Sequence, residues 1–227
     1  MTPETVDALA LSVRVAVLAT LLNGLVGIPL AYALARRRFR GKALVDLAVT
    51  LPLVLPPTVT GYYLIVLLGR RGWLGAPIYA ATGWTIAFTW YAAVVAATVM
   101  ALPLLVRTAR AAIESVDRDL EKAAYTLGRS EWRTTLEVTL PLARNGILVC
   151  AILTFMTSFG EYIYSKSIIQ DISLQPASVG LSGFVGPNSR DWSGIMAYAA
   201  IYVTPILAIF VLLQRRIVAG LTSGALK

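Results

Sequence analysis

The chain has 227 residues, of which 57% are hydrophobic and 14% are charged, and its net charge is +8. Soluble domains carry about 25% charged residues, so this composition excludes an ordinary soluble domain and indicates a membrane-embedded protein. The sequence contains no histidine, which excludes a histidine metal site and a histidine-based catalytic dyad. The basic residues are distributed as in a membrane protein with a defined orientation, and they suit contact with lipid headgroups or with a partner protein. We therefore expect no binding to nucleic acid.

Five segments are long and apolar enough to cross a membrane as helices. A helix needs about 20 apolar residues to span the hydrocarbon core, and it satisfies its own backbone hydrogen bonds there. The expected spans are residues 6–34, 43–68, 84–106, 147–169 and 194–213. The sequence therefore predicts an all-α polytopic membrane protein that forms one transmembrane domain over residues 1–227.

Basic residues concentrate in alternate connections between these spans, and such connections face the cytoplasm. The inner connections and the tail hold Arg36, Arg37, Arg38, Arg40, Lys42, Arg107, Arg110, Arg118, Lys122, Arg129, Arg133, Arg144, Arg215, Arg216 and Lys227. The other connections hold Arg70, Arg71 and Arg190. This distribution predicts that the N-terminus lies outside and the C-terminus inside, with residues 72–83 along the outer surface.

Three prolines interrupt the second expected span, in the run Leu51-Pro52-Leu53-Val54-Leu55-Pro56-Pro57. Proline removes a backbone donor and clashes with the preceding turn, so the helix must kink or break there. Such a break is tolerated where protein or water covers the freed carbonyl groups. Two interpretations stay open: a bent helix that lines a pathway, or a packing kink without contact to solute.

Polar residues within the expected spans are candidates for a pathway or gate, because they are costly in a bilayer. The prolines of the break and the glycine beside Glu161 are included with them. The candidate set is Pro56, Pro57, Thr58, Thr60, Thr157, Ser158, Gly160 and Glu161. Two alternatives compete with this role. The hydroxyl groups can bond to carbonyl groups of their own helix, and Glu161 can hold a neighbouring helix instead of lining a gate.

The third connection, residues 107–145, has the pattern of two helices. Helical spacing of apolar residues predicts that the third span continues to about Val116. Asp117 or Asp119 is a suitable N-cap for a short helix that runs to Leu127, and Gly128 is a suitable C-terminal cap.

A second amphipathic stretch is expected to start near Ser130. Trp132, Leu136 and Leu140 fall at four-residue spacing, which places them on one face of a helix. We expect Pro141 to redirect the chain toward the fourth span.

One motif in this connection is specific in its spacing. It consists of a Glu-x-Ala-Ala-x-x-x-Gly run, nine further residues, and then an aliphatic residue, any residue, Leu and Pro. Its positions are Glu121, Ala123, Ala124, Gly128, Leu140 and Pro141. The pattern resembles the "EAA loop" of transmembrane permease subunits of bacterial ATP-binding-cassette (ABC) importers. The competing interpretation is an ordinary amphipathic helix on the membrane surface.

The resemblance implies a type I ABC importer permease fold in the bacterial inner membrane. The loop would dock a coupling helix into a separate cytoplasmic ATPase dimer, which would bind ATP and Mg and hydrolyse the ATP. This chain would bind no cofactor and would not itself be an enzyme; it also lacks a glycine-rich phosphate-binding loop. The other implied partners are a second permease subunit, an extracytoplasmic solute-binding protein and membrane lipid.

Residues 38–146 most resemble the molybdate permease branch, in runs such as Gly69-Arg70-Arg71-Gly72. This implies transport of molybdate or tungstate through a homodimer. From Pro176-Ala177-Ser178-Val179-Gly180-Leu181 onward, including Asp191-Trp192 and the tail 214–227, the chain is more similar to carbohydrate permeases. The alternatives are therefore a sugar importer, with a heterodimer possible, and an ion-coupled secondary carrier.

Overall fold

The computed structural model describes residues 3–169, 171–184 and 192–225, and these residues form helices and turns without a β-strand. The helices are α1 (Pro3–Arg36), α2 (Lys42–Val54), α3 (Pro57–Leu68), α4 (Gly75–Thr82), α5 (Trp90–Glu114), α6 (Arg118–Thr126), α7 (Glu131–Thr134), α8 (Leu140–Phe159), α9 (Ile163–Ile168), α10 (Ala177–Gly180) and α11 (Trp192–Ala225). A π-helical turn, Thr135–Thr139, joins α7 to α8. Short 3₁₀ turns cover Ile172–Leu174 and Leu181–Phe184.

The helices that are long and apolar enough to cross a membrane agree with the predicted fold class. Within the described residues, four qualify alone, namely Thr5–Arg36, Trp90–Glu114, Glu131–Phe159 and Trp192–Gln214. Helices α2 and α3 would form a fifth span together, but they are bent by 113° at their junction. The predicted break in the second span is thus confirmed.

The break between α2 and α3 follows from the consecutive prolines. A residue that precedes proline is driven out of the helical region toward extended backbone. Leu55 has φ −75° and ψ 142°, and Pro56 has φ −56° and ψ 136°, so both residues that precede a proline are extended. Pro52 lies inside α2 without ending it.

Two expected spans have different boundaries in the structure. The third begins at Trp90 instead of residue 84, because the preceding residues form a turn in which Phe88 adopts a positive φ of 67°. The fourth runs over Glu131–Phe159 instead of residues 147–169. It ends before Gly160, because Glu161 instead caps a separate helix, α9.

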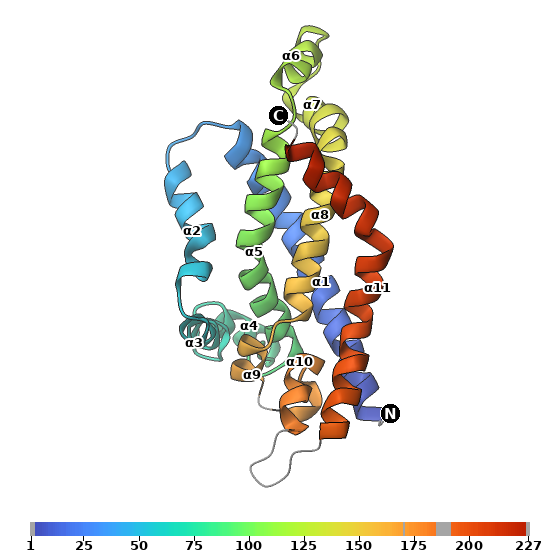
Figure 1. Cartoon of the computed structure of the whole chain (residues 1–227). Helices are drawn as coiled ribbons and strands as arrows, with labels where there is room; N and C mark the ends of the chain where they lie inside the picture. Colours follow the sequence, from blue (N-terminus) through green and yellow to red (C-terminus); the bar gives the residue numbers. More distant parts are fainter. Residues whose placement is uncertain (1–2, 170, 185–191, 226–227) are drawn as a thin grey trace.

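The core of the bundle is built where α1, α5 and α8 pack against one another, and α11 packs on α8 (Figure 1). Small residues allow this close packing, as is usual between membrane helices. Ala31 and Ala109 are fully buried between α1 and α5. A Cβ atom on Gly146 of α8 would lie 2.5 Å from the Cβ atom of Ala112, so α5 and α8 are nearly in backbone contact there.

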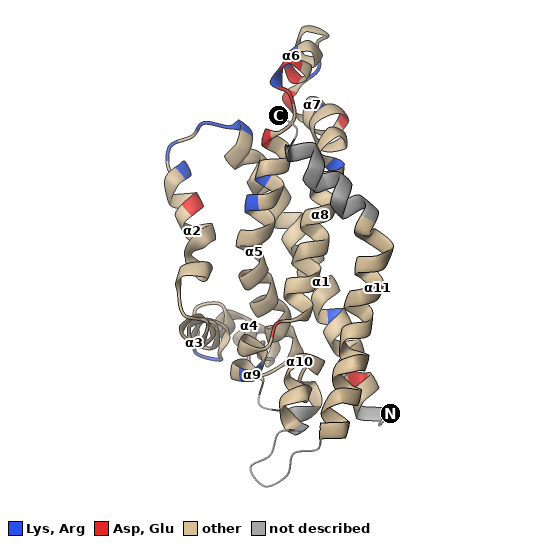
Figure 2. Ribbon diagram, in the orientation of Figure 1, with Lys and Arg blue, Asp and Glu red and all other residues tan. Residues whose placement is uncertain are grey.

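The two ends of the bundle differ. Helices α6 and α7 and the connection 37–41 lie at one end, whereas the N-terminus, α4, α9 and α10 lie at the other (Figure 1). Lysines and arginines are prominent at the first of these ends, including the connection 37–41 (Figure 2). This arrangement agrees with an inner face that carries α6 and an outer face that carries α4.

Candidate coupling site

Helix α6 projects beyond the end of the bundle and has a well-defined start (Figure 1). Asp117 is its N-cap, and the Asp117 carboxylate accepts a hydrogen bond from the backbone N–H of Asp119 at 2.9 Å. Such a cap satisfies one of the free N–H groups of the first turn. The pKa of Asp119 is lowered because Lys122 donates a hydrogen bond to its carboxylate, at 2.6 Å. A negative charge is therefore kept beside the positive end of the helix dipole.

The end of α6 is a Schellman motif centred on Gly128. The N–H of Gly128 bonds to the carbonyl group of Tyr125 at 3.0 Å, and the N–H of Arg129 bonds to that of Ala124 at 3.1 Å. Gly128 has φ +79°, the left-handed conformation that such a cap requires. The predicted short helix, its N-cap and its glycine cap are all present at the expected residues.

Glu121 of the motif is buried and joins three parts of the chain. Arg36, the last residue of α1, donates from Nε to Oε1 of Glu121 at 3.0 Å. The hydroxyl of Thr139, in the π turn, donates to the same Oε1 at 2.7 Å. Arg36 also donates from a terminal guanidinium nitrogen to the carbonyl oxygen of Val116, at 2.8 Å. The start of α6 is thereby fastened to the end of α1 and to the start of the α7–α8 helix.

The expected turn at Pro141 is absent, and this part of the prediction was wrong. Residues Glu131–Phe159 form one continuous helix, and Pro141 lies in the first turn of α8 within it. The π turn Thr135–Thr139 immediately precedes Pro141. A π turn widens the hydrogen-bonding pattern by one residue, which accommodates the missing N–H and the ring of proline. Leu140 is half-buried and Pro141 is exposed.

The two motif alanines face different ways. Ala124 is buried against the chain itself, whereas Ala123 is exposed. Leu120 and Leu127 flank Ala123 at helical spacing, so the three residues form one stripe along α6. Leu127 is 82% exposed and Leu120 is 49% exposed. This stripe is an apolar surface that no element of the described residues covers.

Exposed ion pairs support the same region. Arg37 pairs with Glu131 at 2.9 Å, which links the residue after α1 to the start of α7. Arg129 and Glu137 also form a pair, between the α6–α7 loop and the π turn. Exposed pairs contribute little energy individually, so the buried Arg36–Glu121 pair is the main electrostatic link.

The predicted pathway residues fall into two groups: one lies at the α2–α3 bend and in α3, and the other lies at the end of α8 and in the turn before α9. Helix α3 packs on α9, where a Cβ atom on Gly61 would lie 3.6 Å from both Tyr164 and Ser167. Thr60 is buried and its hydroxyl donates to the carbonyl group of Pro56 at 3.4 Å. Pro56 and Thr58 are exposed near the bend, and Pro57 begins α3.

Glu161 acts in the structure as a helix cap. Its carboxylate accepts hydrogen bonds from the backbone N–H groups of Tyr164 and Ser165, at 2.6 and 3.0 Å, and from the Ser165 hydroxyl at 2.7 Å. The Ser178 hydroxyl donates to the Glu161 carbonyl oxygen at 2.6 Å. These contacts match the helix-holding alternative, in which Glu161 supports the short helix α9.

The other pathway candidates lie at the end of α8. Thr157 donates to the carbonyl group of Leu153 at 2.9 Å, as the back-bonding alternative expected. Ser158 is buried, and its hydroxyl has no partner among the described residues. Gly160 is exposed beyond the last turn. Whether this set lines a pathway stays a prediction.

Sequence reasoning missed the roles of Arg36 and Thr139. Arg36 was one of several charges in a topology count, and Thr139 stood inside the motif without a function. The useful signal was the position of Arg36 at the very end of a long apolar span, where a buried cation requires a partner. No pattern along the sequence brings residue 36 next to residue 121, because their contact depends on the packing of α1 against α5.

A bundle of membrane-spanning helices with a braced helix projecting from its inner end defines a class, the permease subunits of ABC importers. Residues 27–223 match the family model described as "Binding-protein-dependent transport system inner membrane component", and the chain belongs to this family. The protein is therefore a multi-pass inner-membrane component of such a transport system.

Curated relatives give further detail. The chain is 47% identical over 166 residues to the molybdenum transport system permease protein ModB of Escherichia coli K12, covering 73% of this chain and 72% of that protein. It is 40% identical over 177 residues to the protein of the same name from Haemophilus influenzae, covering 78% and 77%. It is 30% identical over 217 residues to the putative molybdenum transport system permease protein YvgM of Bacillus subtilis, covering 94% of each.

Solved structures support the fold alone, because their sequence identities are low. A chain of the MetNI methionine ABC transporter in an inward-facing conformation aligns with a TM-score of 0.71 at 17% identity, covering 97% of this chain and 99% of that one. A chain of an amino acid ABC transporter aligns with a TM-score of 0.68 at 19% identity, covering 95% and 94%. The predicted type I importer permease fold is confirmed.

Proposed function

We propose that this chain is the pathway-forming permease subunit of an importer for molybdate or tungstate, and that α6 couples it to a separate ATPase. The observation that carries the proposal is the bracing of α6 by Glu121, Arg36 and Thr139 beneath an exposed apolar stripe. A helix that is fixed to the bundle on one face and apolar on its free face is suited to transmit force from a docked partner. The ATPase would bind ATP and Mg, whereas this chain would bind neither and would catalyse no reaction.

The contacts of α6 suggest how motion would be transmitted. Arg36 links α6 to the end of α1, and Thr139 links it to the continuous α7–α8 helix. A displacement of the docked α6 would therefore tilt α1 and α8 together. Because a partner shifts a conformational equilibrium only through different affinities for the two states, the ATPase must hold α6 differently when it closes around ATP.

The relatives named for molybdenum transport support an oxyanion as the cargo. A sugar pathway would prefer aromatic rings that are open to the solute, and two tyrosine rings near the end of the bundle that carries α9 are buried. Tyr164 is 1% exposed and Tyr198 is 6% exposed. The hydroxyl of Tyr202 donates to the carbonyl oxygen of Phe159 at 3.1 Å, so this ring fastens α11 to α8. Part of the sugar-like segment, including Asp191, lies outside the described residues.

The remaining partners follow from the same proposal. A second copy of the chain would complete the pathway, since the molybdate-like pattern implies a homodimer. An extracytoplasmic binding protein would deliver the oxyanion to the end that carries α4 and α9.

The docking step is tested by a charge placed in the stripe. The variant Leu127→Glu should abolish copurification of the ATPase, because a carboxylate would be buried in an apolar interface. Lys122→Gln, on the opposite face of α6, is the matched control and should keep the ATPase bound. Membrane insertion and thermal unfolding of the permease should be equal in the two variants. Retention of the ATPase by Leu127→Glu would refute the docking assignment.

The cargo is tested separately in liposomes that contain the permease and its ATPase. ATP hydrolysis should rise when a molybdate-loaded binding protein is added and stay at its basal level with a maltose-loaded one. If only the sugar-loaded protein stimulates ATP hydrolysis, the cargo is a carbohydrate and the oxyanion assignment is wrong.

A further inference from the structure

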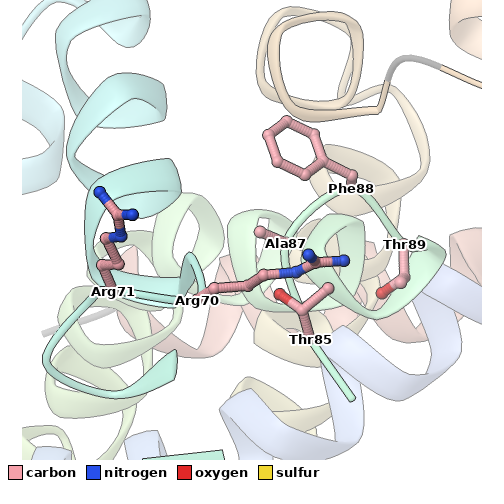
Figure 3. A pocket seen from close by; sticks show the side chains of 6 residues that line it. All are labelled: Arg70, Arg71, Thr85, Ala87, Phe88 and Thr89. Atoms are coloured by element: carbon pink, nitrogen blue, oxygen red, sulfur yellow. The ribbon is translucent and has the colours of Figure 1, made fainter. Parts of the chain in front are cut away.

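A hollow of about 620 Å³ lies at the end of the bundle opposite to α6. It is bounded by the turn after α3 and by the turn before α5. Its lining consists of Arg70, Arg71, Thr85, Ala87, Phe88 and Thr89 (Figure 3). Two guanidinium groups at one small hollow are unusual on the outer face of this chain, where few basic residues occur.

The charges of the hollow are not neutralised within the described part of the chain. The ion pairs found there involve neither Arg70 nor Arg71. The carboxylate of Glu161, at the same end, is occupied by three hydrogen bonds to α9. An anion that entered the hollow would therefore meet two permanently charged groups, since arginine stays protonated at every physiological pH.

Arg70 is held in position by its surroundings. Its guanidinium carbon lies 5.2 Å from the ring centroid of Tyr79 in α4, a distance typical of a cation–π contact. Figure 3 shows the Arg70 side chain extended across the hollow toward Thr85 and Thr89, whereas the Arg71 side chain leaves the same turn in another direction, with its guanidinium group apart from that of Arg70. The cation is thus presented to the hollow instead of moving freely in solvent.

Thr85 supplies a hydrogen-bond donor at the same place. Its hydroxyl oxygen is buried and has no partner among the described residues. A buried hydroxyl without a partner is costly, so a ligand that accepts its hydrogen bond would be stabilised. The Thr89 hydroxyl already donates to the carbonyl group of Ile86, at 2.7 Å, which leaves Thr85 as the free donor of the pair.

The rim of the hollow contains a strained residue. Phe88 has φ +67°, which is costly for a bulky side chain, and such strain is commonly retained at ligand-binding sites. The turn places Phe88 between Ala87 and Thr89 on the side of the hollow that faces Arg70 (Figure 3). The strained turn therefore shapes the wall that carries the hydroxyl groups.

We propose that this hollow is a binding site for a tetrahedral oxyanion group, held by Arg70 and Arg71 through charge and by the Thr85 hydroxyl through a hydrogen bond. Guanidinium groups match the oxygen atoms of such anions in geometry and charge. The group can come from free molybdate or sulfate, or from the phosphate of a lipid headgroup. The site goes beyond the proposed function, which locates no binding group for the cargo.

The test uses the full permease purified with its ATPase and compares four proteins: the wild type, Arg70→Gln, Thr85→Val, and the control Arg38→Gln, which lies in the connection at the opposite end. Radiolabelled molybdate binding is measured by equilibrium dialysis in nanodiscs of phosphatidylcholine. Phosphatidylglycerol retained from mixed nanodiscs is measured by native mass spectrometry.

Loss of a charge-assisted hydrogen bond should weaken binding by about tenfold or more. If Arg70→Gln and Thr85→Val weaken molybdate binding to this extent while Arg38→Gln does not, the site takes the free oxyanion. If they instead reduce retention of phosphatidylglycerol, the site takes the lipid phosphate.

Equal binding of both probes by all four proteins, or binding of neither probe by the wild type, would overturn the site. Each of these results is independent of ATP-driven transport, so failure of this site and failure of the proposed function are distinguishable.

Discussion

Arg36 and Glu121 form a buried ion pair that joins the last residue of the first membrane helix to the first turn of α6. Their side chains are 7% and 9% exposed, and Nε of Arg36 lies 3.0 Å from Oε1 of Glu121. The bond from Thr139 to the same oxygen adds the π turn to this junction. The glutamate of the motif is therefore a structural link inside the chain, and the apolar stripe on α6 is left free for a partner.

Breaking this pair from one side should destabilise the inner end of the bundle more than removing both charges. Arg36→Met or Glu121→Leu alone leaves an unpaired buried charge, with an expected cost of about 3–5 kcal/mol. The double variant should recover a large part of that loss, because neither charge remains. The stability of the three variants is measured by thermal unfolding in detergent. A loss in the double variant equal to the sum of the two single losses would contradict the coupling.

The exposed Arg37–Glu131 pair provides a matched comparison for the same experiment. Its side chains are 60% and 49% exposed, so solvent screens the interaction. Arg37→Met and Glu131→Leu should each change stability by less than about 1 kcal/mol.

Substitution of Gly128 should destabilise the protein because of its backbone conformation and not because of steric contacts. A Cβ atom added at Gly128 would have no heavy atom within 4 Å, yet φ is +79°. Gly128→Ala should therefore cost about 1–2 kcal/mol, and Gly128→Asn should cost less, because asparagine tolerates the left-handed conformation better. The rate of proteolysis in the α6–α7 loop reports the effect. A faster cleavage of the asparagine variant than of the alanine variant would refute this explanation.

Substitution of Gly146 should destabilise the protein because of steric overlap with a neighbouring helix. Its added Cβ atom would lie 2.5 Å from the Cβ atom of Ala112, which has no torsion that moves it away. In Gly146→Ala, overpacking should lower the free energy of unfolding by about 1–3 kcal/mol. The higher helix propensity of alanine should return about 1 kcal/mol, so we expect a net destabilisation.

Gly61 is the control for this prediction. Its nearest contacts would be at 3.6 Å, an ordinary separation, so Gly61→Ala should be neutral or slightly stabilising. Thermal unfolding of the purified proteins compares the two. Equal melting temperatures for both variants would show that α5 and α8 are not in close contact at Gly146.

Local signals predicted the local structures well. An aspartate cap before α6, a glycine cap at Gly128 and a break in the proline run each follow from a few adjacent residues. The structure shows all three and selects Asp117 over Asp119 as the N-cap. The boundary of the fourth span was wrong because apolar composition continues past Phe159, whereas the Glu161 carboxylate starts a new helix. The prediction at Pro141 was wrong because the preceding π turn accommodates the proline within a continuous helix, and a π turn has no strong sequence pattern.

Long-range contacts were beyond the reach of the sequence. The meeting of Arg36 with Glu121 depends on the register between α1 and α5, and hydrophobic spacing alone does not determine that register. The packing of α3 on α9 likewise follows from the bend of 113° between α2 and α3, whose direction no proline pattern specifies. The sequence therefore identified the candidate pathway residues by their type, whereas their spatial arrangement is known only from the structure.

The central claim is that α6 lies on the cytoplasmic side with its apolar stripe covered by a separate ATPase. It is tested most directly by maleimide labelling of Leu127→Cys in a Cys150→Ala background. We predict labelling in inside-out vesicles, loss of that labelling when the ATPase is added back, and no labelling of intact spheroplasts by an impermeant reagent. Labelling from the outer side, or equal labelling with and without the ATPase, would contradict the account.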